Sequence, residues 1–179
     1  MIFSLSRVSS DVLLLRAAEV YTVAVVVHSI DHTRRGIADY GFDLYVLGSM
    51  GLPMQVWLVA VVVVQARIAP LAAIAVGTTS AISFVLIHWL PERMLFSDSY
   101  LTDGAVDGLS QAVVAFLVAA SALLAIAGYV LIRRDASAAT VTWPSLRELR
   151  GTMTSPIVLL MLLGNVAVYA VQLVDRFMA

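Results

Sequence analysis

Hydrophobic residues in this chain gather in long runs that short polar segments separate. A run of about 20 apolar residues is long enough to cross the hydrocarbon core of a bilayer as an α-helix. The runs of about this length lie at 12–30, 44–66, 68–90, 109–132 and 156–174. Many of their residues are β-branched, but a lone strand in lipid leaves its backbone groups unpaired, so helices are predicted. We therefore expect an all-α, polytopic integral membrane protein: one domain, residues 1–179, built as a bundle of five transmembrane helices.

The composition supports this class and excludes others. Hydrophobic residues make up 61% of the 179 positions and charged residues only 13%, whereas soluble domains carry about 25% charged residues. The mean hydropathy is +0.94. The net charge of −1 argues against a nucleic-acid partner, because such proteins need a basic surface. The partner that this composition predicts is the lipid bilayer.

Two absent residue types remove further kinds of chemistry. The chain has no cysteine, which excludes thiolate nucleophiles, disulfides and iron–sulfur clusters. All 11 basic residues are arginine, so a Schiff base on lysine and a P-loop lysine are excluded as well. Exclusive use of arginine is typical of a GC-rich bacterial genome, and the expected location is therefore the bacterial inner (plasma) membrane.

Arginine counting predicts the orientation. Cytoplasmic loops of membrane proteins are enriched in Lys and Arg. Seven arginines lie on the side of the N-terminus and four on the other side, and with the acidic residues the two sides carry +3 and −4. This places the N-terminus in the cytoplasm and the C-terminus outside. The pair Arg34–Arg35 on the outer side is the main contrary observation.

The longest predicted cytoplasmic loop covers 133–155. Within it, Ser145 and Glu148 have the spacing of a capping box, the reciprocal pair of hydrogen bonds that starts a helix. Trp143 comes just before, and tryptophan is enriched at the depth of lipid headgroups. A short interfacial helix is the prediction here, with a docking site for a cytoplasmic partner as the alternative.

The chain's three histidines all fall at the predicted outer ends of apolar runs. His28 and His32 are one helical turn apart, with Asp31 beside both, and such i, i+4 spacing offers two imidazoles to a single ion. His88 ends the third run at the same level. We expect these side chains to meet if the first, third and fourth helices are neighbours.

The predicted metal ligands are His28, Asp31, His32 and His88. Imidazole and carboxylate ligands suit Zn²⁺, Fe²⁺, Mn²⁺ or Cu²⁺. A metal-bound water would be acidified and could attack an ester, amide or headgroup bond, with Asp103 or Asp107 as the candidate general base. The predicted function is a metal-dependent membrane hydrolase or a redox protein.

Other interpretations stay open. Asp31 can simply pair with Arg34 or Arg35, and His28 can bond to a neighbouring helix. His28 and His88 could instead be the axial ligands of a bis-histidine haem. The chain could be a non-catalytic subunit or scaffold that packs against other membrane protein subunits through its outer polar loops. A small transporter ranks third, because the runs contain few polar residues at mid-membrane.

Overall fold

The computed structural model describes residues 3–35, 42–91, 98–104, 106–134 and 143–178, and all regular structure within them is helical. The helices are, in chain order, α1 (Phe3–Arg35), α2 (Phe42–Val63), α3 (Ala69–His88), α4 (Gly108–Arg134), α5 (Leu146–Thr152) and α6 (Pro156–Met178). An all-helical fold confirms the all-α part of the prediction from the long apolar runs. Residues 92–97 of the predicted outer loop and 135–142 of the predicted cytoplasmic loop lie outside the described residues.

Helix α1 is longer than the apolar run that predicts it. The run covers 12–30, whereas the helix begins at Phe3 and continues through Arg35. No glycine or proline occurs between these two residues, so nothing in the sequence interrupts the helix where the polar residues begin. The continuation to Arg35 keeps His28 and His32 on one helical face.

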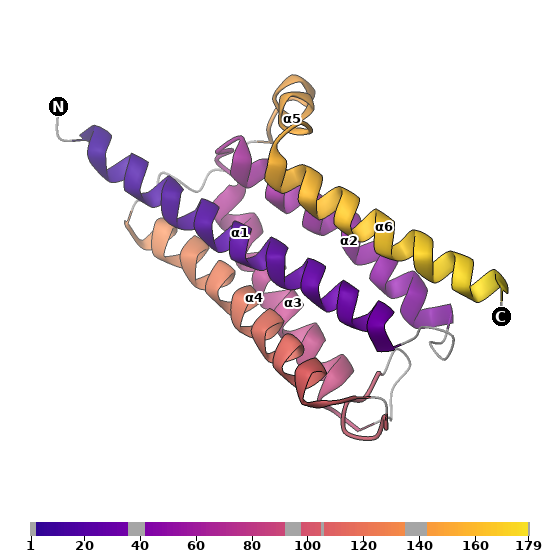
Figure 1. Cartoon of the computed structure of the whole chain (residues 1–179). Helices are drawn as coiled ribbons and strands as arrows, with labels where there is room; N and C mark the ends of the chain where they lie inside the picture. Colours follow the sequence, from indigo (N-terminus) through magenta and orange to yellow (C-terminus); the bar gives the residue numbers. More distant parts are fainter. Residues whose placement is uncertain (1–2, 36–41, 92–97, 105, 135–142, 179) are drawn as a thin grey trace.

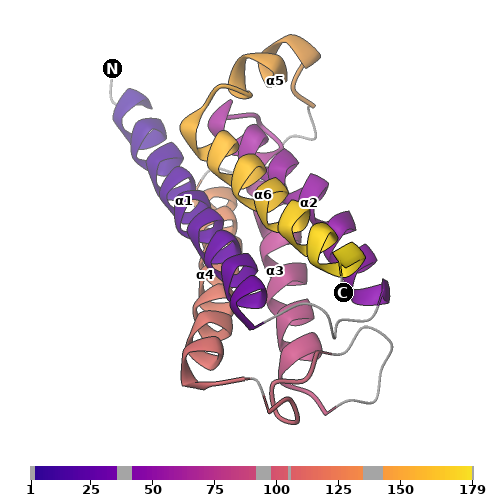
Figure 2. The same ribbon diagram turned by 45° about the vertical axis from the view of Figure 1, so that its right-hand side comes forward.

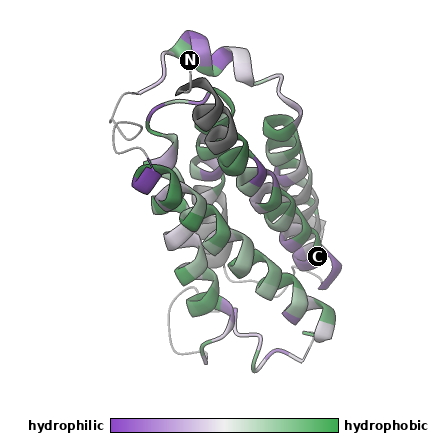
Figure 3. Ribbon diagram, turned by 90° about the vertical axis from the view of Figure 1, so that its left-hand side faces the viewer, coloured by the Kyte–Doolittle hydropathy of each residue, from purple (hydrophilic) through white to green (hydrophobic). Residues whose placement is uncertain are grey.

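The five long helices run up and down beside one another (Figures 1 and 2). We call the end where α1 and α3 finish and α4 begins the histidine end, because it carries His28, His32 and His88. The opposite end carries the short helix α5, which stands apart from the bundle in both views. In Figure 3 hydrophobic colour covers most of the length of the helices, and hydrophilic colour is prominent on α5.

Among the described residues, α3 and α4 make the most extensive contact of any two helices, and two glycines allow their backbones to come close. A Cβ atom on Gly77 would lie 2.6 Å from the backbone oxygen of Ser121, and one on Gly128 would lie 2.5 Å from the backbone oxygen of Pro70. Small residues at helix interfaces in membranes allow backbones to approach in this way. The two glycines therefore fix the separation of α3 and α4, and with it the position of His88.

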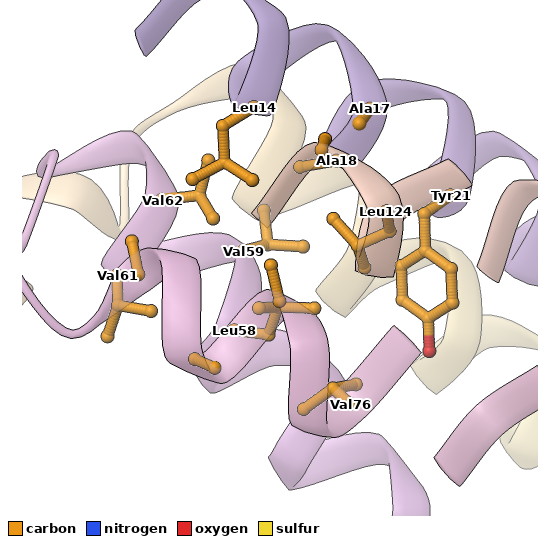
Figure 4. Close-up of a cluster of buried hydrophobic side chains, with 14 of the residues drawn as sticks. Leu14, Ala17, Ala18, Tyr21, Leu58, Val59, Val61, Val62, Val76 and Leu124 are labelled. Carbon is orange, nitrogen blue, oxygen red and sulfur yellow. The ribbon is translucent and has the colours of Figure 1, made fainter. Parts of the chain in front are cut away.

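Among the described residues, the hydrophobic core lies toward the end of the bundle that carries α5. Figure 4 shows part of this core. Its largest fully buried side chains include Tyr21 from α1, Leu58 from α2, Leu124 from α4 and Met161 from α6. Tyr21 donates or accepts a hydrogen bond of 3.0 Å with Ser80 of α3. This bond links α1 to α3 within the bundle, on the way from the core to the histidine end.

The predicted short helix in the 133–155 loop is confirmed as α5. The Ser145 side chain accepts a hydrogen bond from the backbone N–H of Glu148, and the Glu148 carboxylate accepts one from the backbone N–H of Ser145. This is the capping box that the sequence predicts. The carboxylate of Glu148 also accepts a hydrogen bond from the Ser145 hydroxyl, and this bond together with the one from the Ser145 backbone N–H holds the pKa of Glu148 below its ordinary value. Trp143 is exposed, and its ring centre lies 5.5 Å from that of Trp57 on α2.

Three of the described helices are long and apolar enough to cross a membrane, at Val12–Arg35, Ala69–His88 and Gly108–Arg134. A fourth crossing results if Leu146–Thr152 and Pro156–Ala167, which meet at an angle of 76°, form one broken span. In α2 the apolar part among the described residues, Gly51–Val63, is shorter than a full crossing. The chain is thus a helical protein with the character of a membrane protein, and three or four crossings are supported directly.

Candidate metal centre

The three histidines converge at the histidine end of the bundle. His28 and His32 extend from the last turns of α1, and His88 is the last residue of α3. One ligand nitrogen from each ring lies within 4.8 Å of the others. The sequence predicted the proximity of His28 and His32 from their spacing alone, but the arrival of His88 depends on how α1 and α3 pack.

The rings contact one another directly. The Nε2 atoms of His28 and His32 are 2.9 Å apart. The ring centre of His28 lies 5.0 Å from that of His88, and His32 lies 5.6 Å from His88. Phe84, one turn before His88 on α3, packs against His28 at 5.3 Å. His28 and His88 are only 6% and 3% exposed, so the imidazoles are shielded from bulk water.

Asp98 lies in the loop that follows α3, and it places a carboxylate against this cluster. The Nδ1 atom of His88 lies 3.1 Å from the backbone oxygen of Asp98 and 3.3 Å from its Oδ2 atom. Both oxygens can only accept, so Nδ1 of His88 carries the proton and donates it. Burial raises the pKa of Asp98, but the hydrogen bond with His88 and the nearby charges outweigh it, and the net pKa is below the ordinary value.

Arg35 joins this carboxylate to the rest of the site. Its side chain is only 2% exposed, and its guanidinium contacts the carboxylates of Asp31 at 3.3 Å, Asp98 at 3.4 Å and Asp103 at 3.1 Å. It also donates a 2.7 Å hydrogen bond to the hydroxyl of Tyr100 and lies 4.4 Å above that ring. Burial raises the pKa of Tyr100, so its hydroxyl stays protonated. Arg35 thus holds the loop after α3 against the end of α1.

Arg34 makes a separate connection between α1 and α4. It bonds to Asp31 at 2.9 Å and forms two bonds with the carboxylate of Asp107, at 3.0 and 2.9 Å. It also donates to the hydroxyl of Ser110 at 2.9 Å. The two adjacent arginines, which counted against the predicted orientation, therefore serve as partners for acidic side chains at this end.

The predicted site residues are only partly brought together. His28, His32 and His88 form one cluster, whereas Asp31 pairs with Arg34 and Arg35. Asp103 and Asp107 each contact an arginine, and their assignment as general bases stays a prediction. The expected neighbourhood of the first, third and fourth helices is confirmed, since α1 and α3 both pack on α4.

Sequence reasoning missed the parts that Arg35, Asp98 and Tyr100 play. Asp98 and Tyr100 stand in a polar loop, which indicates only a surface segment, yet both are buried against the imidazoles and Arg35. One signal was available, because several acidic residues lie near Arg34–Arg35 in the sequence. Nothing local to the sequence identifies which carboxylate reaches a histidine.

Hydrogen bonding does not account for all the buried nitrogens of the cluster. Arg35 donates toward Nδ1 of His32 over 3.1 Å, so Nε2 of His32 carries a proton and donates it to His28. Nδ1 of His28 then has no hydrogen-bond partner among the described residues. A buried unpaired donor costs about 1–3 kcal/mol. A hydrogen-bond acceptor at this position, such as a water molecule, would supply the missing partner.

The donor set and the charge suit a divalent transition metal. Imidazole is a preferred ligand of zinc, copper and iron. Two nitrogens on a tetrahedral zinc lie about 3.4 Å apart, because each Zn–N bond is about 2.1 Å long, so modest ring rotations would complete the site. Two arginines face four aspartates here, leaving a formal charge of −2 among the described residues with neutral imidazoles. A divalent cation would balance that charge.

The same geometry is unfavourable for haem. Bis-histidine ligation places a flat macrocycle between two imidazoles. Here the rings of His28 and His88 meet edge to face, with His32 against both.

No protein-family model, no curated protein and no solved structure matches the chain. The chemistry of the cluster is therefore the basis for any functional conclusion.

Proposed function

We propose that this is an integral membrane protein that binds one divalent transition metal through His28, His32 and His88. The observation that carries the proposal is the convergence of three imidazoles from two helices, with ligand nitrogens within 4.8 Å of one another. Burial of the imidazoles and the negative balance of the surrounding charges support it. The ion is zinc, iron, manganese or copper, and the all-imidazole donor set favours zinc or copper.

Catalytic zinc sites typically use three protein ligands and leave a further position open to water or substrate. His32 is the most exposed of the three, with 19% of its side chain accessible, so the open position would be reached from its side. A metal here would acidify a bound water or change oxidation state. The proposed activity is hydrolytic or redox chemistry on a substrate held at the membrane surface.

Metal analysis of the full chain, purified in detergent with a tag that contains no histidine, tests the proposal. Stripped protein is reloaded with zinc or cobalt, and bound metal is counted in wild type, His28→Ala and His88→Ala. We expect about one ion per chain in the wild type and almost none in either variant, since the affinity of such sites comes from the ligand count. Because all three histidines are in the cluster, no other imidazole in the chain contributes to the signal.

The competing function is a non-catalytic subunit of a larger membrane assembly. The hydrogen bond between His28 and His32 and the arginine–aspartate pairs at the same end favour it, because they can hold the helix ends without a metal. Wild-type protein that binds no metal above the level of His88→Ala would leave this function standing. Copurification of a fixed partner after mild solubilisation would then support it directly.

The topology proposed for this function has five crossings, a cytoplasmic N-terminus and the histidine end outside. The arginine distribution supports the orientation, and the alternating directions of the five long helices put the termini at opposite ends. Single-cysteine labelling tests it cleanly, because the native chain has no cysteine. Thr102→Cys, exposed at the histidine end, should react with a membrane-impermeant reagent on intact cells, and Thr154→Cys, exposed at the opposite end, should not.

A further inference from the structure

Besides the three imidazoles, the cluster contains one carboxylate oxygen that lies near two of them. Oδ2 of Asp98 is 3.3 Å from Nδ1 of His88 and 3.8 Å from Nδ1 of His32. Metal-binding histidines usually donate their second ring N–H to a carboxylate or carbonyl, which fixes the tautomer and the ring orientation. Asp98 is placed to do this for both rings.

His88 already has the tautomer that a metal requires. Its Nδ1–H donates to the backbone oxygen of Asp98 at 3.1 Å, with the carboxylate beside it. Nε2 of His88 therefore carries a lone pair and is the nitrogen available to an ion.

His32 has the opposite tautomer in the metal-free arrangement. Arg35 donates to its Nδ1 atom, so its Nε2–H points at Nε2 of His28, 2.9 Å away. A ligand nitrogen cannot carry a proton, so metal binding through Nε2 requires the proton to move to Nδ1 of the same ring. Nδ1–H then needs an acceptor in place of the Arg35 donor, and Oδ2 of Asp98 lies close by. The proton count of the ring does not change.

Arg35 can release His32 without being left unpaired. Its guanidinium keeps contacts with Asp31, Asp98, Asp103 and the Tyr100 hydroxyl. The contact of Nη2 with Oδ2 of Asp98, at 3.4 Å, helps to hold that carboxylate beside the imidazoles. Among the described residues, Asp98 is thus the carboxylate that contacts both His88 of α3 and Arg35 of α1. Arg35 in turn bonds to His32.

We propose that Asp98 is the positioning residue of the metal centre, orienting His88 and, once a metal is bound, His32 as Nε2 ligands. This inference rests on the proposed function, because it assigns a role within the same site. It makes the loop segment that contains Asp98 part of the metal centre, although Asp98 itself does not bind the ion. Loss of such an outer partner typically weakens metal affinity 10–100-fold.

The test measures the zinc affinity of the full chain in detergent by competition with a chelator. Asp98→Ala should bind zinc about 10–100-fold more weakly than wild type, and Asp98→Glu should recover part of the loss. Asp107→Ala is the matched control, because it removes a carboxylate from the same end whose bonds are with Arg34 and Ser110. It should change the affinity by no more than about threefold, since an exposed ion pair contributes little. If Asp107 is also a general base, its removal would change the rate of turnover but not the zinc affinity, so Asp107→Ala remains a valid control.

A spectroscopic measurement on the wild type covers the case in which Asp98→Ala does not fold. Nitrogen-15 labelling of histidine gives six ring nitrogens from the three residues. Zinc should move the proton of His32 from Nε2 to Nδ1 and leave that of His88 on Nδ1. Zinc-loaded protein in which His32 keeps its proton on Nε2, or an Asp98→Ala variant with wild-type affinity, would overturn this inference alone. Wild type that takes up no zinc would overturn the metal site itself.

Discussion

Tyr21 of α1 and Ser80 of α3 share a buried hydrogen bond of 3.0 Å, although 59 positions separate them in the chain. Both side chains are almost fully buried. The bond joins the same two helices that supply the three imidazoles, two turns before His28 on α1 and two turns before His88 on α3. Together with the contact between the rings of His28 and His88, the bond therefore connects α1 and α3 and holds the two helices in register.

Losses of stability from the two partners of this bond should not be additive. Ser80→Ala leaves the buried Tyr21 hydroxyl without its partner, which costs about 1–3 kcal/mol. The double variant Tyr21→Phe/Ser80→Ala should lose less than the sum of the two single losses. Interhelical bonds in membrane proteins give coupling energies of about 0.6 kcal/mol, with a maximum of about 1.7. Unfolding in mixed micelles measures all four proteins of the cycle, and strictly additive losses would contradict a direct bond.

Alanine at Gly77 or Gly128 should disrupt the α3–α4 interface. A Cβ at either site would meet backbone atoms at 2.5–2.6 Å, and backbone cannot rotate away as a flexible side chain can. Overpacking typically costs about 1–3 kcal/mol, and here it should also displace His88. We expect lower thermal stability together with weaker metal binding. Gly151→Ala is the control, because nothing lies within 4 Å of its Cβ position, and it should leave both properties unchanged.

Metal should stabilise the folded protein, and only when the histidines are intact. An ion that binds the folded state alone adds about 2.7 kcal/mol at a concentration 100 times its Kd. Zinc should therefore raise the unfolding midpoint of wild type, and a chelator should reverse the change. His88→Ala should unfold at the same midpoint with and without zinc. An equal rise in both proteins would point to zinc bound elsewhere.

Asp107 should make stability depend on pH at the acid end. Its bonds with the backbone of Ser110 and with Arg34 lower its pKa from 3.8 to about 2 in the folded state. A lowered folded pKa means that the stabilisation is complete above the unfolded pKa and is lost as the pH falls from about 4 toward 2. Asp107→Asn should remove this part of the acid transition, as measured by unfolding midpoints between pH 2 and 6. The effect should be small and sensitive to salt, because the pair is exposed.

Much of this protein could be predicted locally. The apolar runs predict the long helices, because length and hydrophobicity are properties of contiguous sequence. The capping box at Ser145 and Glu148 was predicted from spacing and is present in α5. The last turns of α1 were not included in the predicted span, because hydropathy declines at Asp31 although the helix continues.

The pairing of charges could not be predicted in the same way. Arg35 has polar residues around it in the sequence, yet its side chain is buried against three carboxylates and Tyr100. A hydrophobicity profile treats it as a residue at the membrane surface. Apart from Asp31 and His32, its partners come from a loop more than 60 positions away.

The sequence by itself determined that the chain forms long apolar helices and that His28 and His32 share a helical face, since both follow from the period of the α-helix. Only the tertiary structure decided that His88 joins them and that Asp98 stands behind two of the rings. The reason is that these distances depend on helix packing. Glycines 77 and 128 bring α3 against α4, α1 packs on α4 and α6, and no local pattern encodes where their ends meet.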